Sequence, residues 1–194
     1  MWLLIPAKTS TLAKRRLSPV LSDEARAVLA RLLLARLLTL ITGFEEVADA
    51  VVVSGDAGLR AIARLFGYHA LPEPEPDLNA ALEAGRGYAI ERGAESMLVL
   101  PTDLPWLSKE SLAALFQHTT LSDPRVVIAY DKHGLGTNAL FQQPADAIPF
   151  HFGIGSAKKH RALAVEAGLP LIEVKDPELA WDLDLPEDWS RLVA

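Results

Sequence analysis

Short apolar runs alternate with longer amphipathic segments along most of this chain. Runs that end at proline, glycine or an acid predict buried strands, and apolar positions repeating every three or four residues predict helices. The predicted strands cover residues 2–6, 50–54, 69–71, 97–100, 125–130, 138–142 and 171–174. The predicted helices cover residues 22–42, 58–66, 78–92, 108–118, 153–167 and 186–192. Residues 7–21, between the first strand and the first helix, are predicted to form a loop.

Local signals support these helix boundaries. Ser22, Asp77 and Ser108 are residue types that accept a hydrogen bond at a helix N-cap, and Gly43 suits the end of the first helix. The alternating order predicts an α/β fold, a three-layer sandwich around a mostly parallel, Rossmann-like sheet. The later strands are joined by short links, so we expect at least one to be antiparallel.

The composition favours one domain spanning residues 1–194. Half of the residues are hydrophobic and there is no cysteine, which excludes disulfides, thiolate metal sites and cysteine nucleophiles. The longest apolar segment, residues 28–41, is interrupted by Arg31 and Arg36 and therefore predicts a packed helix, not a membrane span. No signal-peptide core precedes it, so we expect a cytoplasmic protein with no membrane partner.

The charge is distributed unevenly along the chain. A net charge of −6 argues against a nucleic-acid partner. Four basic residues nevertheless lie within the first 22 positions, where there is no acid: Lys8, Lys14, Arg15 and Arg16. Such a basic loop is either a solvated surface segment or a site for a small anionic ligand, and three of its side chains (Lys8, Lys14 and Arg16) could neutralise a triphosphate.

Two acidic segments are candidates for a metal site. Asp103 follows the apolar run 97–100 and lies between Pro101 and Pro105, at the end of a strand where α/β sheets bind ligands. Asp182 and Asp184 point the same way if the backbone is extended. Together the three carboxylates could bind Mg²⁺. The alternatives are that Asp103 caps a rigid turn and that Asp184 caps the helix beginning at Pro186.

Two glycine-hydroxyl segments are candidates for anion binding. Residues 153–161 combine Gly153, Gly155 and Ser156 with a helix start and basic side chains. Residues 134–138 include Thr137 and could equally form an ordinary hairpin turn. The five histidines have no metal-ligand spacing, and His118 and His160 are expected on helix surfaces, so we assign no histidine a catalytic role. No P-loop or dinucleotide-binding glycine motif is present.

Taken together, the segments resemble the 2-phospho-L-lactate guanylyltransferase family, a branch of the MobA-like nucleotidyltransferases. The resemblance covers nearly the whole chain and rests on several short motifs in the family's order. These are IPAK (5–8), AKRRL (13–17), LNAAL (78–82), LPTDLP (100–105), GTNAL (136–140), FGIGS (152–156) and DLDLPED (182–188). Each motif is weak alone, and their shared order is specific.

The resemblance implies an enzyme of deazaflavin coenzyme biosynthesis with the nucleotide-diphospho-sugar transferase fold. It would transfer GMP from GTP to 2-phospholactate, phosphoenolpyruvate or 3-phosphoglycerate and release diphosphate. The family motifs assign roles to residues at matching positions. Mg²⁺ would bind Asp103 and Asp184, with Asp182 a further candidate; the acceptor would bind Thr137, Gly153 and Ser156; the triphosphate would bind Lys8, Lys14 and Arg16; the nucleotide would contact Asn79. The family also suggests a homodimer.

The chain departs from the family pattern in two places. Residues 72–77 read Pro-Glu-Pro-Glu-Pro-Asp where glycines are common, which affects the loop expected beside the nucleotide base. Leu185 replaces a threonine, which removes a hydroxyl that could cap the last helix. Three alternatives stay open: a related nucleotidyltransferase with a sugar phosphate or molybdopterin acceptor, a glycosyltransferase, and a non-catalytic nucleotide-binding protein.

Overall fold

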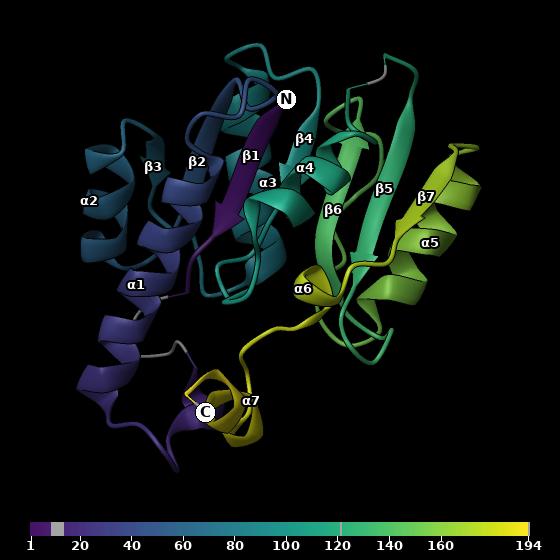
Figure 1. The fold of residues 1–194 in the computed structure, drawn as a ribbon. Coiled ribbons are helices and arrows are strands. Elements are labelled where there is room, and N and C mark those ends of the chain that lie inside the picture. The colour runs from purple at the N-terminus through teal and green to yellow at the C-terminus, as the bar shows by residue number, and fades with distance from the viewer. Residues whose placement is uncertain (9–13, 121, 194) are drawn as a thin grey trace.

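One mixed sheet, built from the predicted strands, forms the centre of the structure (Figure 1). The computed structural model describes residues 1–8, 14–120 and 122–193. The strands of this part of the chain are β1 (Trp2–Pro6), β2 (Asp49–Val53), β3 (His69–Leu71), β4 (Met97–Val99), β5 (Arg125–Tyr130), β6 (Thr137–Gln143) and β7 (Leu171–Val174). They lie in the order β3-β2-β1-β4-β6-β5-β7. Only β6 runs antiparallel to its neighbours, β4 and β5, so the prediction of a mostly parallel sheet is confirmed.

The helices follow the predicted boundaries closely. They are α1 (Asp23–Ile41), α2 (Ala57–Leu65), α3 (Leu78–Ile90), α4 (Lys109–Phe116), α5 (Ser156–Glu166), α6 (Pro177–Ala180) and α7 (Pro186–Leu192). The predicted caps are confirmed at Ser22, Asp77 and Ser108, whose side chains accept from backbone N–H groups. The sequence analysis missed the short α6. It also missed a 3-10 helix, η1 (Arg15–Leu17), within the predicted loop 7–21; residues 9–13 of that loop lie outside the described residues.

Side-chain alternation along the strands produces the three layers. Leu3 and Ile5 of β1 face a core shared with α1, α2 and α4, while Trp2 and Leu4 face a core shared with α3 and α5. Because helices cover both faces of the sheet, its central strands β1, β2 and β4 are almost wholly apolar. None of the helices in the described ranges is long and apolar enough to cross a membrane.

A small third core joins the two ends of the chain. The α7 helix lies beside the purple segment that precedes α1 in Figure 1, where η1 lies, and buried leucines fill the contact between them. The buried members are Leu17 of η1, Leu33 of α1 and Leu183, and Trp189 and Leu192 pack against them. This packing holds the basic N-terminal segment next to residues 182–184.

The strand order also determines where a ligand can bind. From β1 the chain moves to β2 and β3 on one side and then crosses to β4 on the other side of β1. The loops after β1 and β4 therefore diverge and leave a crevice at the carboxyl end of the sheet.

The close packing of α3 on the sheet gives a direct test of the fold. A Cβ atom at Gly85 would lie 2.3 Å from Leu4 Cδ1 and 2.9 Å from Val53 Cγ2, whereas one at Gly87 would meet nothing within 4 Å. We predict that Gly85→Ala lowers the free energy of unfolding by about 1–3 kcal/mol through overpacking. Gly87→Ala should raise it by about 0.5–1 kcal/mol through helix propensity. Urea denaturation measures both, and equal effects would contradict the packing.

Candidate active site

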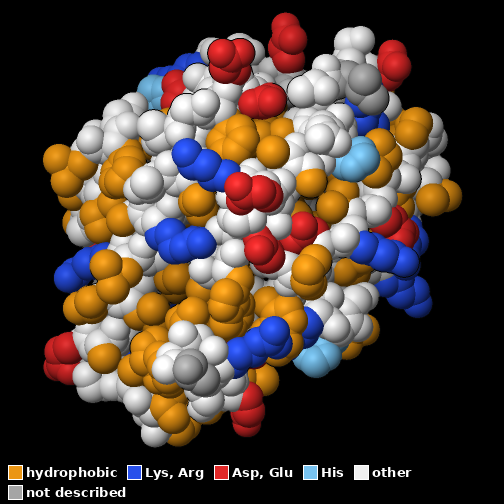
Figure 2. Space-filling model, in the orientation of Figure 1, with side chains coloured by type: hydrophobic (Ala, Val, Ile, Leu, Met, Phe, Trp, Pro, Cys, Tyr) orange, Lys and Arg blue, Asp and Glu red, His pale blue; other side chains and the backbone are white. Residues whose placement is uncertain are grey.

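A cleft of about 500 Å³ opens at the carboxyl ends of β1 and β4. Nine of the ten site residues predicted from the sequence line it: Lys8, Lys14, Arg16, Asp103, Thr137, Gly153, Ser156, Asp182 and Asp184. Asn79 does not line it, although its neighbour Leu78 does. Figure 2 shows acidic side chains gathered near the middle of the displayed face, with basic side chains around them. The fold thus brings together segments from both ends and the middle of the chain.

Lys14 and Asp103 form the innermost ion pair of the cleft. Lys14 Nζ donates to Asp103 Oδ2 at 2.9 Å, and the lysine side chain is only 9% exposed. Burial raises the pKa of Asp103, but the charge and hydrogen bond of Lys14 outweigh it and the pKa lies below its usual value. Lys14 itself has a left-handed backbone (φ 55°), a conformation that costs a non-glycine residue energy. The ion pair is one of the contacts that hold Lys14 there.

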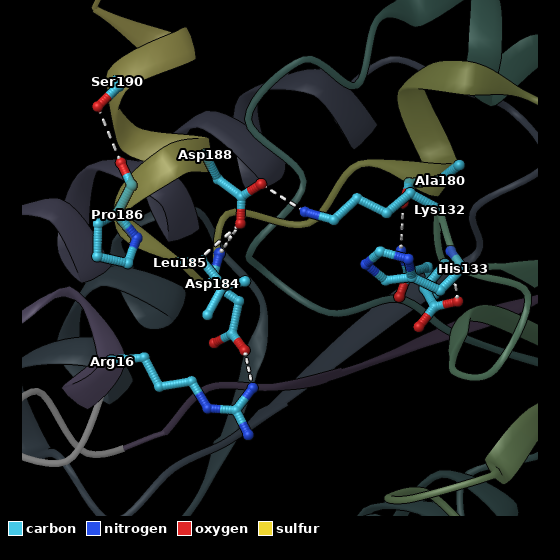
Figure 3. Close-up of polar contacts among 11 residues, drawn as sticks. Arg16, Lys132, His133, Ala180, Asp184, Leu185, Pro186, Asp188 and Ser190 are labelled. Atoms are coloured by element: carbon cyan, nitrogen blue, oxygen red, sulfur yellow. Dashed lines mark hydrogen bonds and ion pairs between the residues drawn. The ribbon is translucent and has the colours of Figure 1, made fainter.

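Arg16 and Asp184 form a second, more exposed ion pair at the mouth of the cleft. Arg16 Nη1 donates to Asp184 Oδ2 at 2.7 Å, and the two side chains are 70% and 36% exposed. Water screens such a pair, so it stabilises the fold by at most about 1 kcal/mol. Figure 3 shows Arg16 reaching from the N-terminal segment toward Asp184. Two of the three predicted cationic residues, Lys14 and Arg16, therefore each contact a predicted metal ligand.

Asp188 caps α7 and leaves Asp184 free for the cleft (Figure 3). One oxygen, Asp188 Oδ2, accepts from the backbone N–H of Asp184 at 3.1 Å and of Leu185 at 2.8 Å. Its other oxygen pairs with Lys132. Burial raises the pKa of Asp188, but these hydrogen bonds and the Lys132 charge lower it overall. The alternative that Asp184 caps this helix is therefore wrong, and Leu185 provides no side-chain cap, as expected.

Asp182 is the third carboxylate of the cleft. The backbone N–H of Leu183 donates to the Asp103 carbonyl at 2.9 Å, which holds residues 182–184 against the loop after β4. Burial, and then the negative charge of Asp103, raise the pKa of Asp182 above its usual value. An added cation would relieve this repulsion.

The two glycine-hydroxyl segments meet at a second part of the cleft lining, which is called the glycine-hydroxyl wall below. Asp131 Oδ1 accepts from the backbone N–H of His133 and Leu135, and a Cβ at Gly136 would lie 2.7 Å from its other oxygen. Only glycine therefore allows this loop to close on Asp131. The backbone N–H of Ala157, at the start of α5, donates to the Leu135 carbonyl at 3.1 Å. These contacts place Thr137 and Ser156 on the same wall.

Asn79 lies behind this wall at the start of α3. Its Oδ1 accepts from the backbone N–H of Phe152 at 2.8 Å, and its Nδ2 donates to the Phe152 carbonyl at 3.2 Å. This pair of bonds anchors residues 151–152, called the strap below, which lead into Gly153. Within the described residues, the Asn79 side chain thus supports Phe152 and Gly153, which line the cleft.

The expectation that His160 lies on a helix surface is wrong. His160 is fully buried and contacts Thr137 and the backbone of His151. Its place could have been inferred from the Ser156–Ala164 face of the helix, because residues 156, 157, 160 and 164 are its buried positions. Sequence reasoning also missed Asp131, whose acidic side chain lines the cleft.

Comparison with known proteins identifies the family. Residues 1–193 match the family described as guanylyl transferase CofC like. The chain belongs to this CofC-like guanylyltransferase family. The CofC-like chain is 39% identical over 191 residues to a phosphoenolpyruvate guanylyltransferase of Rubrobacter xylanophilus, covering 98% of this chain and 92% of that protein. A 3-phospho-D-glycerate guanylyltransferase of Colwellia psychrerythraea is 31% identical over 192 residues, covering 98% and 90%.

Solved structures share the fold of this CofC-like chain. A Desulfovibrio desulfuricans protein assigned to the nucleotide-diphospho-sugar transferases has a TM-score of 0.77 and 17% identity, covering 98% of this chain and 85% of that chain. The molybdopterin-guanine dinucleotide biosynthesis protein A of Archaeoglobus fulgidus has a TM-score of 0.56 and 14% identity, covering 98% and 96%. The predicted fold class is confirmed, and the chain is a nucleotidyltransferase.

The charge balance of the CofC-like cleft predicts opposite stability effects for its carboxylates. The raised pKa of Asp182 means that ionised Asp182 costs stability at neutral pH, a cost relieved as the pH falls through that pKa. The lowered pKa of Asp103 contributes stability above about pH 4 that is lost on acidification.

In metal-free buffer at pH 7, Asp182→Asn should therefore raise the melting temperature by about 1–3 °C. Asp184→Asn, whose ion pair is exposed, should change it by less than about 2 °C, and Asp103→Asn should lower it. Scanning calorimetry measures all three variants. A lower melting temperature for Asp182→Asn would contradict the assigned repulsion.

Proposed function

We propose that this guanylyltransferase transfers GMP from GTP to a small phosphorylated carboxylic acid and releases diphosphate, in deazaflavin coenzyme biosynthesis. The observation that carries the proposal is that one cleft is lined by the ion-paired Lys14 and Arg16, by Asp103, Asp182 and Asp184, and by Thr137 and Ser156. A cationic group suits a triphosphate, and paired hydroxyls and glycine backbone suit a second anion. Homodimer formation and a cytoplasmic location remain predictions.

Phosphoenolpyruvate is the acceptor that we propose first. The relatives from Rubrobacter xylanophilus and Sphaerobacter thermophilus, 39% and 36% identical, are named phosphoenolpyruvate guanylyltransferases. The more distant Colwellia relative is named for 3-phospho-D-glycerate. 2-Phospholactate is the third acid of the same size and charge that the family resemblance implies. All three carry a phosphate and a carboxylate, which the wall containing Thr137, Gly153 and Ser156 would bind.

The acidic group of the cleft, which consists of Asp103, Asp182 and Asp184, fits a magnesium ion shared with substrate phosphates. Its donors are carboxylate oxygens, the ligands Mg²⁺ prefers. The negative charge of Asp103 adds to the effect of burial in raising the pKa of Asp182, and an added cation would relieve that repulsion. Among the described residues, no group of three or more acidic or histidine side chains is placed to hold a metal ion by itself. Mg²⁺ can bind through one or two carboxylates and complete its shell with water and phosphate oxygens, so the proposal requires only two protein ligands. Asp103 and Asp184 would hold it, with Asp182 as a further candidate.

The residues of the cleft would act by positioning and by neutralising charge. Lys14 and Arg16 would leave their carboxylate partners for the β- and γ-phosphates and stabilise the departing diphosphate. Lys8, exposed at the rim, would contact the triphosphate. Asn79 does not line the cleft and would act on the nucleotide through the segment at Phe152 that its side chain anchors. Bound Mg²⁺ would supply charge neutralisation on the phosphate oxygens.

The reaction needs no general base. A phosphate monoester is largely ionised at neutral pH, so its oxygen can attack the α-phosphorus of GTP directly. One phosphorus–oxygen bond forms to the acceptor, the bond between the α-phosphorus and the bridging oxygen breaks, and diphosphate leaves with the electron pair. Alignment of the two substrates would account for most of the rate enhancement.

Product analysis tests the proposal directly. The protein is incubated with GTP, Mg²⁺ and each of the three acids in turn, and the products are identified by mass spectrometry with diphosphate assayed in parallel. We expect a GMP–acid conjugate and one diphosphate per conjugate, with phosphoenolpyruvate the most rapidly used. Release of a nucleoside diphosphate, or no conjugate with any acid, would contradict the proposal.

Removing one carboxylate charge tests the acidic group. Asp103→Asn should reduce turnover by about 100-fold or more, because a metal ligand and the partner of Lys14 are lost together. The matched control is Asp146→Asn, which changes an exposed aspartate outside the cleft. Circular dichroism should show both variants folded. Near-normal turnover by Asp103→Asn would reject Asp103 as a metal ligand.

A further inference from the structure

A buried histidine connects Thr137, in the lining of the cleft, with the segment that leads into Gly153. His160 lies on the inner face of α5 and is fully buried. Its Nδ1 lies 3.0 Å from Thr137 Oγ1, and its Nε2 lies 3.0 Å from the backbone nitrogen of His151. A buried imidazole with a partner on each nitrogen is held in one orientation.

These contacts determine which ring nitrogen carries the proton. The backbone N–H of His151 can only donate, so Nε2 of His160 accepts and has no hydrogen. Burial, and then the charges of His151 and Lys159, lower the pKa of His160 to about 4, which keeps the ring neutral at pH 7. The one ring hydrogen of His160 is therefore on Nδ1 and is donated to the Thr137 hydroxyl oxygen.

The direction of that bond determines what Thr137 can do. A hydroxyl that accepts from a histidine keeps its own hydrogen for another partner. In the part of the chain that the structure describes, His160 is the only hydrogen-bond partner of the Thr137 hydroxyl, and Thr137 lines the cleft. Its hydrogen is thus available to an oxygen in the cleft that accepts hydrogen bonds, as phosphate and carboxylate oxygens do.

His160 also supports the strap that continues into Gly153. Besides its bond to the His151 N–H, its ring packs edge-on against Phe152 with 4.9 Å between the centroids. Asn79 holds the same strap from the other side through both polar backbone atoms of Phe152. His160 therefore contacts the strap as well as Thr137, and Asn79 supports the strap independently of His160.

We propose that His160 is a positioning residue that presents the Thr137 hydroxyl as a hydrogen-bond donor to an anionic oxygen of the acceptor. This inference rests on the proposed function, because it assigns the glycine-hydroxyl wall of the cleft to the phosphorylated acid. His160 does not touch substrate; it acts through Thr137.

The proton position is tested without activity. Long-range ¹H–¹⁵N spectra of ¹⁵N-histidine-labelled wild-type protein, with His160→Asn used for assignment, report the tautomer at pH 7. We expect a protonated Nδ1 and a bare Nε2 for His160. A hydrogen on Nε2, or a charged ring, would overturn the proposal.

The role in binding is tested by steady-state kinetics with phosphoenolpyruvate and GTP. Thr137→Val and His160→Leu should each raise the KM for phosphoenolpyruvate by about 10- to 100-fold, because each removes a donor to an anion or its orientation. The KM for GTP should change by less than about 3-fold. The double variant should be no worse than Thr137→Val alone. The proposal would be overturned if the increases in KM for phosphoenolpyruvate caused by the two single substitutions multiplied in the double variant. It would also be overturned if Thr137→Val left this KM unchanged.

Two conservative variants separate the two contacts of the ring. The amide of an asparagine at 160 reaches about as far as Nδ1, and that of a glutamine about as far as Nε2. His160→Asn should therefore keep a KM for phosphoenolpyruvate close to wild type, whereas His160→Gln should resemble His160→Leu. The reverse order would show that His160 acts by holding the strap alone. His118→Gln, outside the cleft, is the control and should change neither KM.

These outcomes separate failure of this inference from failure of the proposed function. No turnover by the wild-type protein with any of the three acids would contradict the proposed function, while the tautomer measurement would still stand. Normal wild-type turnover combined with multiplying variant effects would contradict only the role of His160. Thermal unfolding of each variant identifies any that are not folded.

Discussion

Repulsion among carboxylates in one cleft is the constraint on which this site depends. The backbone bond from Leu183 to the Asp103 carbonyl brings Asp182 and Asp184 beside Asp103, and two cations from the N-terminal segment balance them. The balance is incomplete at Asp182, whose pKa is raised by burial and then by the negative charge of Asp103. A site with unbalanced negative charge and loosely held cations is suited to a divalent metal and a triphosphate arriving together.

The fold supplies the structure that makes this arrangement possible. The reversal of strand order at β1 opens a crevice, and the third core around Leu17 and Leu183 holds η1 against the C-terminal segment. Asp188 takes over the capping of α7 and leaves Asp184 to Arg16. The Asp131 loop and buried His160 hold the part of the lining that contains Thr137. One part of the cleft thus carries the charged side chains, and another presents hydrogen-bond donors that can orient an anion.

Much of this could be predicted from the sequence, for identifiable reasons. Apolar periodicity located the strands and major helices, and capping residues such as Ser22 located helix starts. Acids, cations and glycines were found because their chemistry is local and their motifs keep a family order. The position of His160 was missed because the histidine was judged by its charged neighbours and not by its spacing from Ser156, Ala157 and Ala164, which share its helix face. The sequence analysis considered Asp184 as the cap of α7 and overlooked Asp188, whose carboxylate accepts from the backbone N–H groups of Asp184 and Leu185, four and three residues earlier. Its second contact, with Lys132, joins residues 56 apart in sequence and could not be read from a local pattern.

Titration with Mn²⁺, a substitute for Mg²⁺ observable by electron paramagnetic resonance, tests the central claim most directly. In the presence of a non-hydrolysable GTP analogue, the free Mn²⁺ signal should fall as wild-type protein is added, with about one ion bound per chain. The doubly substituted Asp103→Asn, Asp184→Asn protein should leave the signal at the level of the analogue alone. Equal Mn²⁺ binding by the two proteins would contradict an acidic group that binds the metal with the nucleotide.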